Sequence, residues 1–579
     1  MKYLAIILVA VLAILIVVFI SWFLNMKANG KCPLCALKKI FIPTKLTIDI
    51  SEDEEYSENK VAQTPPMGWS SWNTFRNNID QDIIMQTAHA MKDSGLANAG
   101  YEFINLDDCW QSSLRDSDGK LQGDLGTFSR GIPKLIKDIN ALDLKVGLYS
   151  SNGTLTCEDL PASLGNERLD AKTIASWGCE FFKYDFCHHN RISGDCPAIE
   201  HIVITKPKSA FEIDLRPEDA EFTGRAKIIK MSDVPSKKAI GFISHGSGSA
   251  SFNFDADEKG EYVLTFVFHK SMAKKKQYMQ IHINGKMYEI FFPETKGFSP
   301  LGRQQIIVEL KEGTNNMTIK NPVATAIDSS YIQYKRMGDA LKEASSMWAK
   351  VTHSEEKPIT YSICEWGMAR PYLWGAKAGS MWRTTPDIAP NWRSITMIYN
   401  RTLKLYKHSG PGHWNDPDML EVGNGKLDDN ENRAHFSLWC MLAAPLTLGN
   451  DIRSFVSNGM PDKDNETLKI VTNKHMIAVD QDSLGKSAKR IKKESGIDII
   501  ARPLSNGDVA LCLFNTASST KSVNFKLDDL TKDPYLGIEE SPSGYELHDL
   551  WTDERSTGTT INATIPKHST VVYRVKPTI

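Results

Sequence analysis

Short apolar segments that resemble β-strands alternate with amphipathic segments of helical period in two blocks of the chain, residues 63–195 and 335–490. Such alternation is typical of parallel β-α units, because neighbouring parallel strands must be joined by a crossover that is usually a helix. Together the two blocks have about the length of one eight-stranded barrel. The sequence therefore predicts an α/β fold, a (β/α)8 TIM barrel. The strand-like segments of the first block are 101–106, 145–149 and 179–184, and its helix-like segments are 81–94 and 132–142.

The pattern between the two blocks has a period of two. Residues 196–334 contain alternating stretches such as 249–254, with Asn284-Gly285 as a turn signal and no helical period. This pattern predicts an inserted antiparallel β-sandwich within the barrel sequence. The barrel pattern resumes with a predicted helix over 336–351. Residues 491–579 alternate again and predict a C-terminal antiparallel β-domain.

The N-terminus carries an uncharged apolar run from Leu4 to Leu24, about long enough to span a bilayer. We interpret residues 1–30 as a transmembrane anchor or, if cleaved near Ala28-Asn29-Gly30, a signal segment. Residues 31–62 are interpreted as a linker, because 46–62 are polar and acidic. Lysines after the run favour a cytoplasmic location for the rest of the chain. Five Asn-x-Ser/Thr sequons and an expected disulfide favour export. We expect a membrane-anchored protein whose folded part is extracellular or lumenal, or a secreted protein if the segment is cleaved.

The composition argues against a nucleic-acid partner and against a scaffold held together by disulfides. The net charge of -2 gives no electrostatic basis for binding nucleic acid. The ten cysteines are too dilute for a disulfide scaffold, and the pair Cys32 and Cys35 has no second pair at zinc-binding spacing. The folded core must therefore come from apolar packing in the barrel and the two β-domains.

Polar side chains gather where the predicted barrel strands end, which is where barrel enzymes place their reactive groups. Several of these ends carry carboxylates, and Lys183 and Arg383 lie among them. Such convergence predicts an active site. The residues at the strand ends are Asp107, Asp108, Tyr149, Lys183, Asp185, Cys364, Glu365, Trp366, Arg383, Asp387, Asp416 and Asp418.

Paired carboxylates are the groups that retaining glycoside hydrolysis requires, at a separation of about 5–5.5 Å. The nucleophile must stay ionised, and Lys183 lies on the same strand face as Asp185. The acid must hold a proton, and Pro386 and Ile388 would give Asp387 an apolar surround. The alternative is a metal site, but its only nearby histidines are His188-His189. We predict no metal in the active site.

Six motifs resemble those of glycoside hydrolase family 27, the α-galactosidase and α-N-acetylgalactosaminidase family. The resemblance covers residues 63–195 and 335–579. The motifs are Thr64-Pro-Pro-Met-Gly-Trp-Ser-Ser-Trp72, Leu106-Asp-Asp-Cys-Trp110, Phe182-Lys-Tyr-Asp185, Cys364-Glu-Trp-Gly367, Trp382-Arg-Thr-Thr-Pro-Asp387 and Trp414-Asn-Asp-Pro-Asp-Met419.

This resemblance implies roles for individual residues. Asp185 matches the nucleophile and Asp387 the general acid/base, and Trp72 would stack on the apolar face of the sugar. Asp107 and Asp108 would accept hydrogen bonds from the 4- and 6-hydroxyls of galactose. The remaining matches are the pocket residues Tyr149, Lys183, Cys364, Trp366, Arg383, Asp418 and Met419, and a disulfide between Cys157 and Cys187.

The resemblance implies hydrolysis of terminal α-linked galactose from oligosaccharides or glycoconjugates with retention, and no cofactor for catalysis. Two alternatives stay open: an α-N-acetylgalactosaminidase or another pyranosidase of the family, and a catalytically silent carbohydrate-binding membrane protein. Cys364 would lie by the 2-hydroxyl and Trp366 would wall the pocket. An acetamide buried there without a donor costs about 1–3 kcal/mol, which favours galactose.

The chain departs from the family at two places. Asn77 stands where a first-loop cysteine would pair with Cys109, so we expect that bridge to be missing. The insertion is not part of the common pattern and resembles carbohydrate-binding modules of families 6 and 35. Modules of that kind often hold a structural calcium, although the sequence gives no firm ligand set for one. The alternative is a structural insert that binds nothing.

Overall fold

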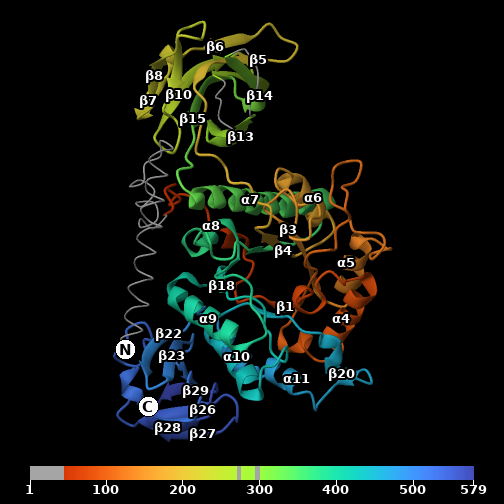
Figure 1. Ribbon diagram of the computed structural model, residues 1–579, viewed down its shortest axis with the longest axis vertical. Helices are drawn as coiled ribbons and strands as arrows, with labels where there is room; N and C mark the ends of the chain where they lie inside the picture. Colours follow the sequence, from red (N-terminus) through yellow and green to blue (C-terminus); the bar gives the residue numbers. More distant parts are fainter. Residues whose placement is uncertain (1–44, 270–275, 294–299, 579) are drawn as a thin grey trace, which may run out of the picture. The chain divides into compact units, whose positions relative to one another are not determined.

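The computed structural model describes residues 45–269, 276–293 and 300–578 (Figure 1). The apolar run within the predicted transmembrane or signal segment, residues 1–30, lies outside these ranges. Among the described residues, every helix is too short or too polar to cross a membrane.

The described residues form two compact units. One comprises Asp49–Arg191 and Ser329–Ile579, and the other is built mainly from Ile192–Asp328. The divisions lie within a few residues of the limits 196 and 334 that the sequence predicts for the insertion. Each unit is described by itself below.

The first unit contains a barrel of eight parallel strands in the order β18-β17-β16-β4-β3-β2-β1-β19. A parallel bridge between Leu420, just after β18, and Leu448 in β19 closes it. The predicted TIM barrel is therefore confirmed. The strands are β1 (Met67–Ser70), β2 (Phe103–Asn105), β3 (Lys145–Ser151), β4 (Phe181–Asp185), β16 (Thr360–Ile363), β17 (Met381–Arg383), β18 (Trp414–Asp416) and β19 (Leu446–Leu448).

Helices surround these strands (Figure 1). They form because their apolar residues recur at helical spacing: in α5, for example, Ile132, Leu135, Ile136 and Ile139 are all buried. Asp80 caps α4 by accepting a hydrogen bond from the Ile83 amide at 2.8 Å. The helices are α3 (Trp72–Phe75), α4 (Gln81–Asp93), α5 (Ile132–Asn140), α6 (Glu167–Ser176), α7 (Ala326–Thr352), α8 (Gly375–Ala378), α9 (Trp392–Thr402), α10 (Asp429–Met441), α11 (Glu466–Val471) and α12 (Lys474–Asp480).

Helix α7 begins at Ala326, ten residues before the helix predicted over 336–351. Its first turns do carry a buried apolar face, with Ile327, Tyr331 and Tyr334 at helical spacing. Serines such as Ser330 interrupt the apolar pattern in these turns, although they are buried. The sequence pattern therefore assigned these turns to the insertion.

Part of the predicted linker 31–62 is packed on the barrel. Tyr56 is 2% exposed and begins a short 3-10 helix, Tyr56–Asn59. Its hydroxyl donates a hydrogen bond to the Ile359 carbonyl at 2.7 Å. The acidic residues that suggested a linker flank Tyr56, which packs on the barrel.

The inserted unit is an antiparallel β-sandwich, as its period of two predicts. One sheet has the order β13-β12-β15-β10-β7 and the other β14-β11-β5-β9-β8, with β6 pairing β5. Alternate residues of both sheets form one apolar core. The strands are β5 (Ile199–Thr205), β6 (Glu212–Leu215), β7 (Glu221–Gly224), β8 (Lys227–Lys230), β9 (Lys238–Gly241), β10 (Gly248–Ala256), β11 (Gly260–His269), β12 (Gln277–Ile283), β13 (Lys286–Phe292), β14 (Leu301–Leu310) and β15 (Gly313–Lys320).

The C-terminal β-domain belongs to the same unit as the barrel. Its larger sheet has the order β22-β23-β24-β29-β26-β27, and β25 pairs with β28. Buried Arg502 ties it to the barrel by donating to the Cys440 carbonyl of α10 at 2.8 Å. The strands are β22 (Lys489–Glu494), β23 (Ile497–Pro503), β24 (Val509–Asn515), β25 (Lys521–Lys526), β26 (Tyr545–Asp549), β27 (Arg555–Gly558), β28 (Thr560–Ile565) and β29 (Thr570–Pro577).

Candidate active site

The predicted polar residues meet at the carboxyl ends of the barrel strands. Asp185 ends β4 and pairs in register with Ser151 of β3, and Arg383 ends β17 beside Asp416 of β18. Because all eight strands are parallel, these ends open on the same side of the barrel. The chemistry therefore depends on how these side chains contact one another.

Asp185 is buried, with 6% of its surface exposed. Its Oδ2 accepts a hydrogen bond from the Tyr149 hydroxyl at 3.1 Å, and its Oδ1 accepts one from the Phe186 amide at 2.8 Å. Burial raises the pKa of Asp185, against the lowering effect of Lys183. The carboxylate is thus fixed by two donors and is more basic than an ordinary aspartate.

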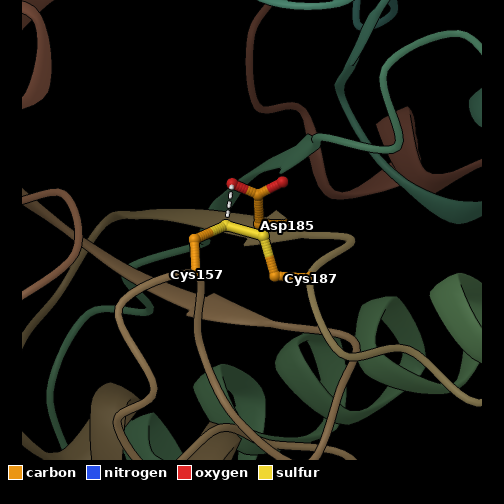
Figure 2. Close-up of side chains that lie close together, drawn as sticks. All are labelled: Cys157, Asp185 and Cys187. Atoms are coloured by element: carbon orange, nitrogen blue, oxygen red, sulfur yellow. Dashed lines mark hydrogen bonds between the residues drawn. A yellow bond between two sulfur atoms is a disulfide. The ribbon is translucent and has the colours of Figure 1, made fainter.

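A disulfide joins Cys157 to Cys187, two residues after Asp185, as the resemblance implied. Figure 2 shows the carboxylate of Asp185 standing over this disulfide, with Cys157 Sγ 3.8 Å from Oδ2. The sulfur carries no hydrogen, so the contact is one of packing. The bridge fixes the chain just after Asp185 to the loop that follows β3. Cys109, which lacks its expected partner cysteine, is a free thiol.

The ammonium of Lys183 contacts Asp107, with Nζ 2.7 Å from Oδ2. The sequence predicted Lys183 as the cation beside Asp185; it acts on Asp185 through its field, but its direct partner is Asp107. Burial acts to lower the pKa of Lys183, but Asp107 and other acidic groups raise it well above its usual range. Lys183 is therefore a permanent cation in the site.

Arg383 is the second cation and contacts two carboxylates. Its Nη2 lies 2.9 Å from Asp387 Oδ1 and 2.8 Å from Asp418 Oδ2. Its Nη1 lies 3.6 Å from Cys364 Sγ. The buried guanidinium therefore contacts three groups: the predicted acid Asp387, the carboxylate of Asp418 and the thiol of Cys364.

The environment of Asp387 differs from the apolar surround that the sequence predicted. Burial acts to raise the pKa of Asp387, but Arg383, with Lys183, lowers it below the ordinary value. Ile388 is buried, whereas Pro386 is exposed and the Asp387 side chain is 67% exposed. The apolar-surround prediction is wrong for the free protein because Arg383, at the end of β17, contacts Asp387.

Asp418 holds the loop that carries Asp387. Its Oδ2 accepts a hydrogen bond from the Ile388 amide at 2.8 Å, and its own amide donates to Asp416 Oδ1 at 2.8 Å. Asp418 has a φ of 82°, a conformation that few residues other than glycine adopt. Burial raises the pKa of Asp416 to about 6.

The two tryptophans that the resemblance assigns to the site are both partly exposed. Trp366 packs edge-on against Phe186, the residue after Asp185, with ring centroids 5.9 Å apart. Trp72 begins α3, and the Arg76 guanidinium lies 5.8 Å from its ring centroid. Asn73, next to Trp72, donates to Glu421 Oε1 at 2.6 Å.

A cavity inside the barrel forms the floor of the site. Six predicted residues line it, and sequence reasoning missed Ser70, Asn105, Ser362 and Thr447, which are ordinary polar residues within strands and give no signal by type. The polar and sulfur-containing lining residues are Ser70, Asn105, Asp107, Lys183, Ser362, Met381, Arg383, Asp416, Asp418, Met419 and Thr447.

Two strand-end carboxylates are directed to the backbone. Asp108 accepts from the amides of Cys109 and Glu158 at 2.8 and 3.0 Å, and burial raises its pKa to about 6. Glu365 is fully buried, accepts from the Ala369 amide at 2.5 Å, and has a pKa raised by burial to about 8. Glu365 is therefore a structural acid rather than a member of the converging set.

Known proteins resemble both parts of the first unit. The sequence matches the family described as Alpha galactosidase A over residues 64–201 and 325–482, and the Alpha galactosidase C-terminal beta sandwich domain over 494–575. An alpha-galactosidase of Cyamopsis tetragonoloba is 30% identical over 90% of this chain and 88% of its own length. Alpha-galactosidase 2 of Arabidopsis thaliana is 30% identical over 92% of this chain and 96% of its own.

A solved structure has the same architecture. Alpha-galactosidase I from Mortierella vinacea superposes with a TM-score of 0.61 at 26% identity, covering 90% of this chain and 98% of that one. The match to the Alpha galactosidase A family leaves out residues 202–324, which lie within the inserted β-sandwich.

Proposed function

The chain belongs to the alpha galactosidase A family, and from this premise we propose that it hydrolyses terminal α-linked galactose with Asp185 as nucleophile and Asp387 as general acid/base. The observation that carries the proposal is the environment of these two carboxylates. Asp185 is fixed by Tyr149 and the Phe186 amide, and Asp387 is exposed to an incoming substrate. Both carboxylates lie in the field of Lys183 and Arg383.

In the first displacement, Asp185 attacks the anomeric carbon while the bond to the leaving oxygen breaks. The proton of Asp387 passes to that oxygen, and a galactosyl ester of Asp185 remains. A bound sugar would cover Asp387, and loss of water around it would raise its pKa toward the protonated form that this step requires. Arg383 keeps the carboxyl oriented throughout.

In the second displacement, Asp387 removes a proton from water, which attacks the anomeric carbon and releases Asp185. Esterification has removed the negative charge of Asp185. The loss of this nearby like charge lowers the pKa of Asp387, so that Asp387 stays ionised and can act as the base. The anomeric configuration is retained after two inversions. Carboxylates supply both steps, so catalysis needs no cofactor.

The sugar is selected by the remaining side chains. Asp107, held by Lys183 on the cavity floor, and Asp108 would accept hydrogen bonds from the 4- and 6-hydroxyls, and Trp72 would stack on the apolar face of galactose. Cys364, whose Sγ lies 3.6 Å from Arg383 Nη1, would lie near the 2-hydroxyl. Trp366, fixed on Phe186, would exclude a 2-acetamide.

A panel of nitrophenyl α- and β-glycosides tests the proposal. We expect hydrolysis of the α-galactoside, and near-complete loss in Asp185→Asn because an amide cannot form the glycosyl ester. Near-native turnover by Asp185→Asn, or equal hydrolysis of the β-galactoside, would contradict the assignment.

The same panel tests the 2-position. The α-galactoside should exceed the α-N-acetylgalactosaminide by roughly 5- to 150-fold in kcat/KM, the equivalent of about 1–3 kcal/mol. Trp366→Ala should narrow this ratio and Trp366→Phe should keep it. Comparable kcat/KM on the two substrates would favour the N-acetylgalactosaminidase alternative.

We further propose that the insertion is a carbohydrate-binding module similar to families 6 and 35, because its two packed sheets have the architecture of such modules. Replacing residues 196–324 by a short Gly/Ser bridge should preserve hydrolysis of a nitrophenyl galactoside and weaken binding to polymeric galactoside. Unchanged binding to the polymer would contradict a binding role. Of the described residues, neither group of three metal-binding side chains lies in the insertion, so a calcium site there would need other ligands.

The apolar run Leu4 to Leu24 is the basis for proposing a membrane anchor with an exported catalytic region. Export predicts glycosylation at sequons such as Asn465, and anchoring predicts retention in the membrane fraction after a carbonate wash. Recovery of unglycosylated protein in the soluble cytosolic fraction would contradict both.

A further inference from the structure

Two histidines and an aspartate converge between helix α12 and the C-terminal β-domain, in a part of the molecule that the catalytic mechanism does not use. His475 is the second residue of α12, His548 lies on β26, and Asp553 lies in the turn between β26 and β27. One ligand-capable atom from each lies within 4.8 Å of the other two. His548 and Asp553 lie five residues apart on one hairpin, whereas His475 comes from a distant part of the sequence and is brought to them by the fold.

Both imidazoles direct the same nitrogen to one carboxylate oxygen. Nε2 of His548 lies 2.6 Å from Asp553 Oδ1, and Nε2 of His475 lies 3.2 Å from it. The two rings are 4.8 Å apart and nearly perpendicular. The His475 contact lacks hydrogen-bond geometry, and its Nε2 is a buried nitrogen without a hydrogen-bond partner among the residues that the structure describes.

We propose that His475, His548 and Asp553 form a binding site for a transition-metal dication such as Zn²⁺, with water completing the coordination. Imidazole nitrogen and carboxylate oxygen are common zinc ligands, bound at about 2.0–2.2 Å, so two ligands of a tetrahedral site lie about 3.3 Å apart. The His475 contact already has this spacing. The His548 contact must open by less than about 1 Å, and Asp553 can move because its side chain is 59% exposed.

The charges around the site are compatible with a cation. His548 pairs across the sheet with Arg555 and Arg574, but each arginine is neutralised by its own carboxylate. Arg555 contacts Glu546 at 2.7 Å, and Arg574 contacts Asp508 at 2.5 Å. Neither guanidinium therefore presents an uncompensated charge to the metal position.

The proposed ligands come from two elements that already pack together. A bound ion would join α12 to the C-terminal β-domain, where Asn473 already donates to the Leu550 carbonyl at 3.0 Å.

Zinc titration of the full chain by calorimetry, after removal of metal with EDTA, tests the proposal. The titration is done with Cys32→Ser and Cys35→Ser in all samples, so that the N-terminal thiols do not compete. We expect one Zn²⁺ per chain and a higher Tm with Zn²⁺. His475→Ala and His548→Ala should each weaken binding by more than about tenfold.

A matched control is His568→Ala. His568 also pairs with a carboxylate, Glu431 at 2.7 Å, but belongs to no three-residue group among the described side chains, so this variant should bind Zn²⁺ as the parent does. Asp553→Asn keeps both imidazoles and suits the positive φ of 64° at this position, so it should fold and still lose affinity.

Hydrolysis of a galactoside reports folding in every variant, because the three proposed ligands lie outside the proposed catalytic machinery. Absence of Zn²⁺ binding by the parent chain, or equal binding by the parent and the three ligand variants, would overturn the proposal. Either result leaves the proposed glycosidase function untouched.

Discussion

Nη2 of Arg383 lies 2.9 Å from Oδ1 of Asp387, and this contact joins a guanidinium that is 3% exposed to a carboxylate that is 67% exposed. The same nitrogen lies 2.8 Å from Asp418, which is 5% exposed. Arg383 thus pairs with two carboxylates, Asp387, which is open to solvent, and Asp418, which is enclosed by protein. Removal of the two carboxylates should therefore have different consequences.

Asp418→Asn should lower the free energy of unfolding by about 3–5 kcal/mol, because it leaves the buried charge of Arg383 without its enclosed partner. Asp387→Asn should lower it by less than about 1 kcal/mol, because solvent screens an exposed pair. Urea denaturation of both variants measures the difference. Equal losses of stability would contradict the distinction between the two contacts.

The pH dependence of hydrolysis follows from the two catalytic carboxylates. As pH rises, Asp185 ionises and becomes a competent nucleophile, whereas Asp387 ionises and can no longer act as the acid. Because burial raises the pKa of Asp185 and Arg383 lowers that of Asp387, kcat/KM should be bell-shaped with its maximum well below neutrality. The basic limb of kcat should lie at higher pH, since bound substrate covers Asp387. A kcat/KM optimum at or above pH 7 would contradict this assignment.

Glu365 should make stability fall as pH rises. Its folded-state pKa of about 8 exceeds the usual value, so its contribution is fully present in acid and is lost as pH rises toward 8. Glu365→Gln removes this titration and keeps an acceptor for the Ala369 amide. The variant should gain stability relative to the parent between about pH 5 and pH 8, with turnover little changed. Parallel Tm curves across that range would count against a buried, protonated Glu365.

The disulfide beneath Asp185 should affect both stability and turnover. Replacing Cys157 and Cys187 by serine opens a closed loop with a sequence separation of 30 and should cost about 3–4 kcal/mol. Turnover should fall because Asp185 loses its packing contact with the bridge. Cys109→Ser, at a free thiol, is the control and should retain both properties. A double variant as stable and active as the control would show that the bridge has no such role.

Much of the barrel could be predicted because its signals are local. Apolar periodicity marked the strands that end at Asp107 and Asp185, and the parallel topology then brings their ends together. The start of α7 was missed because residues such as Ser330 are buried by tertiary packing that a local pattern does not contain.

The electrostatics of the site could not be predicted from residue type. Lys183 was expected as the cation near Asp185, and residue type alone could not show that its direct partner is Asp107. The loop conformation that brings Arg383 against Asp387 depends on Asp418 and the Ile388 amide, a contact across 30 residues. Glu365 resembled a site carboxylate in sequence, but the fold directs it to backbone amides.

The central claim is that Asp185 becomes covalently bonded to the sugar. The most direct measurement is mass spectrometry of peptides after reaction with a fluorinated α-galactosyl fluoride that slows the second displacement. We predict one sugar per chain on the peptide that contains Asp185, and none in Asp185→Asn. A sugar on Asp387, or rapid hydrolysis with inversion and no labelled peptide, would contradict the claim.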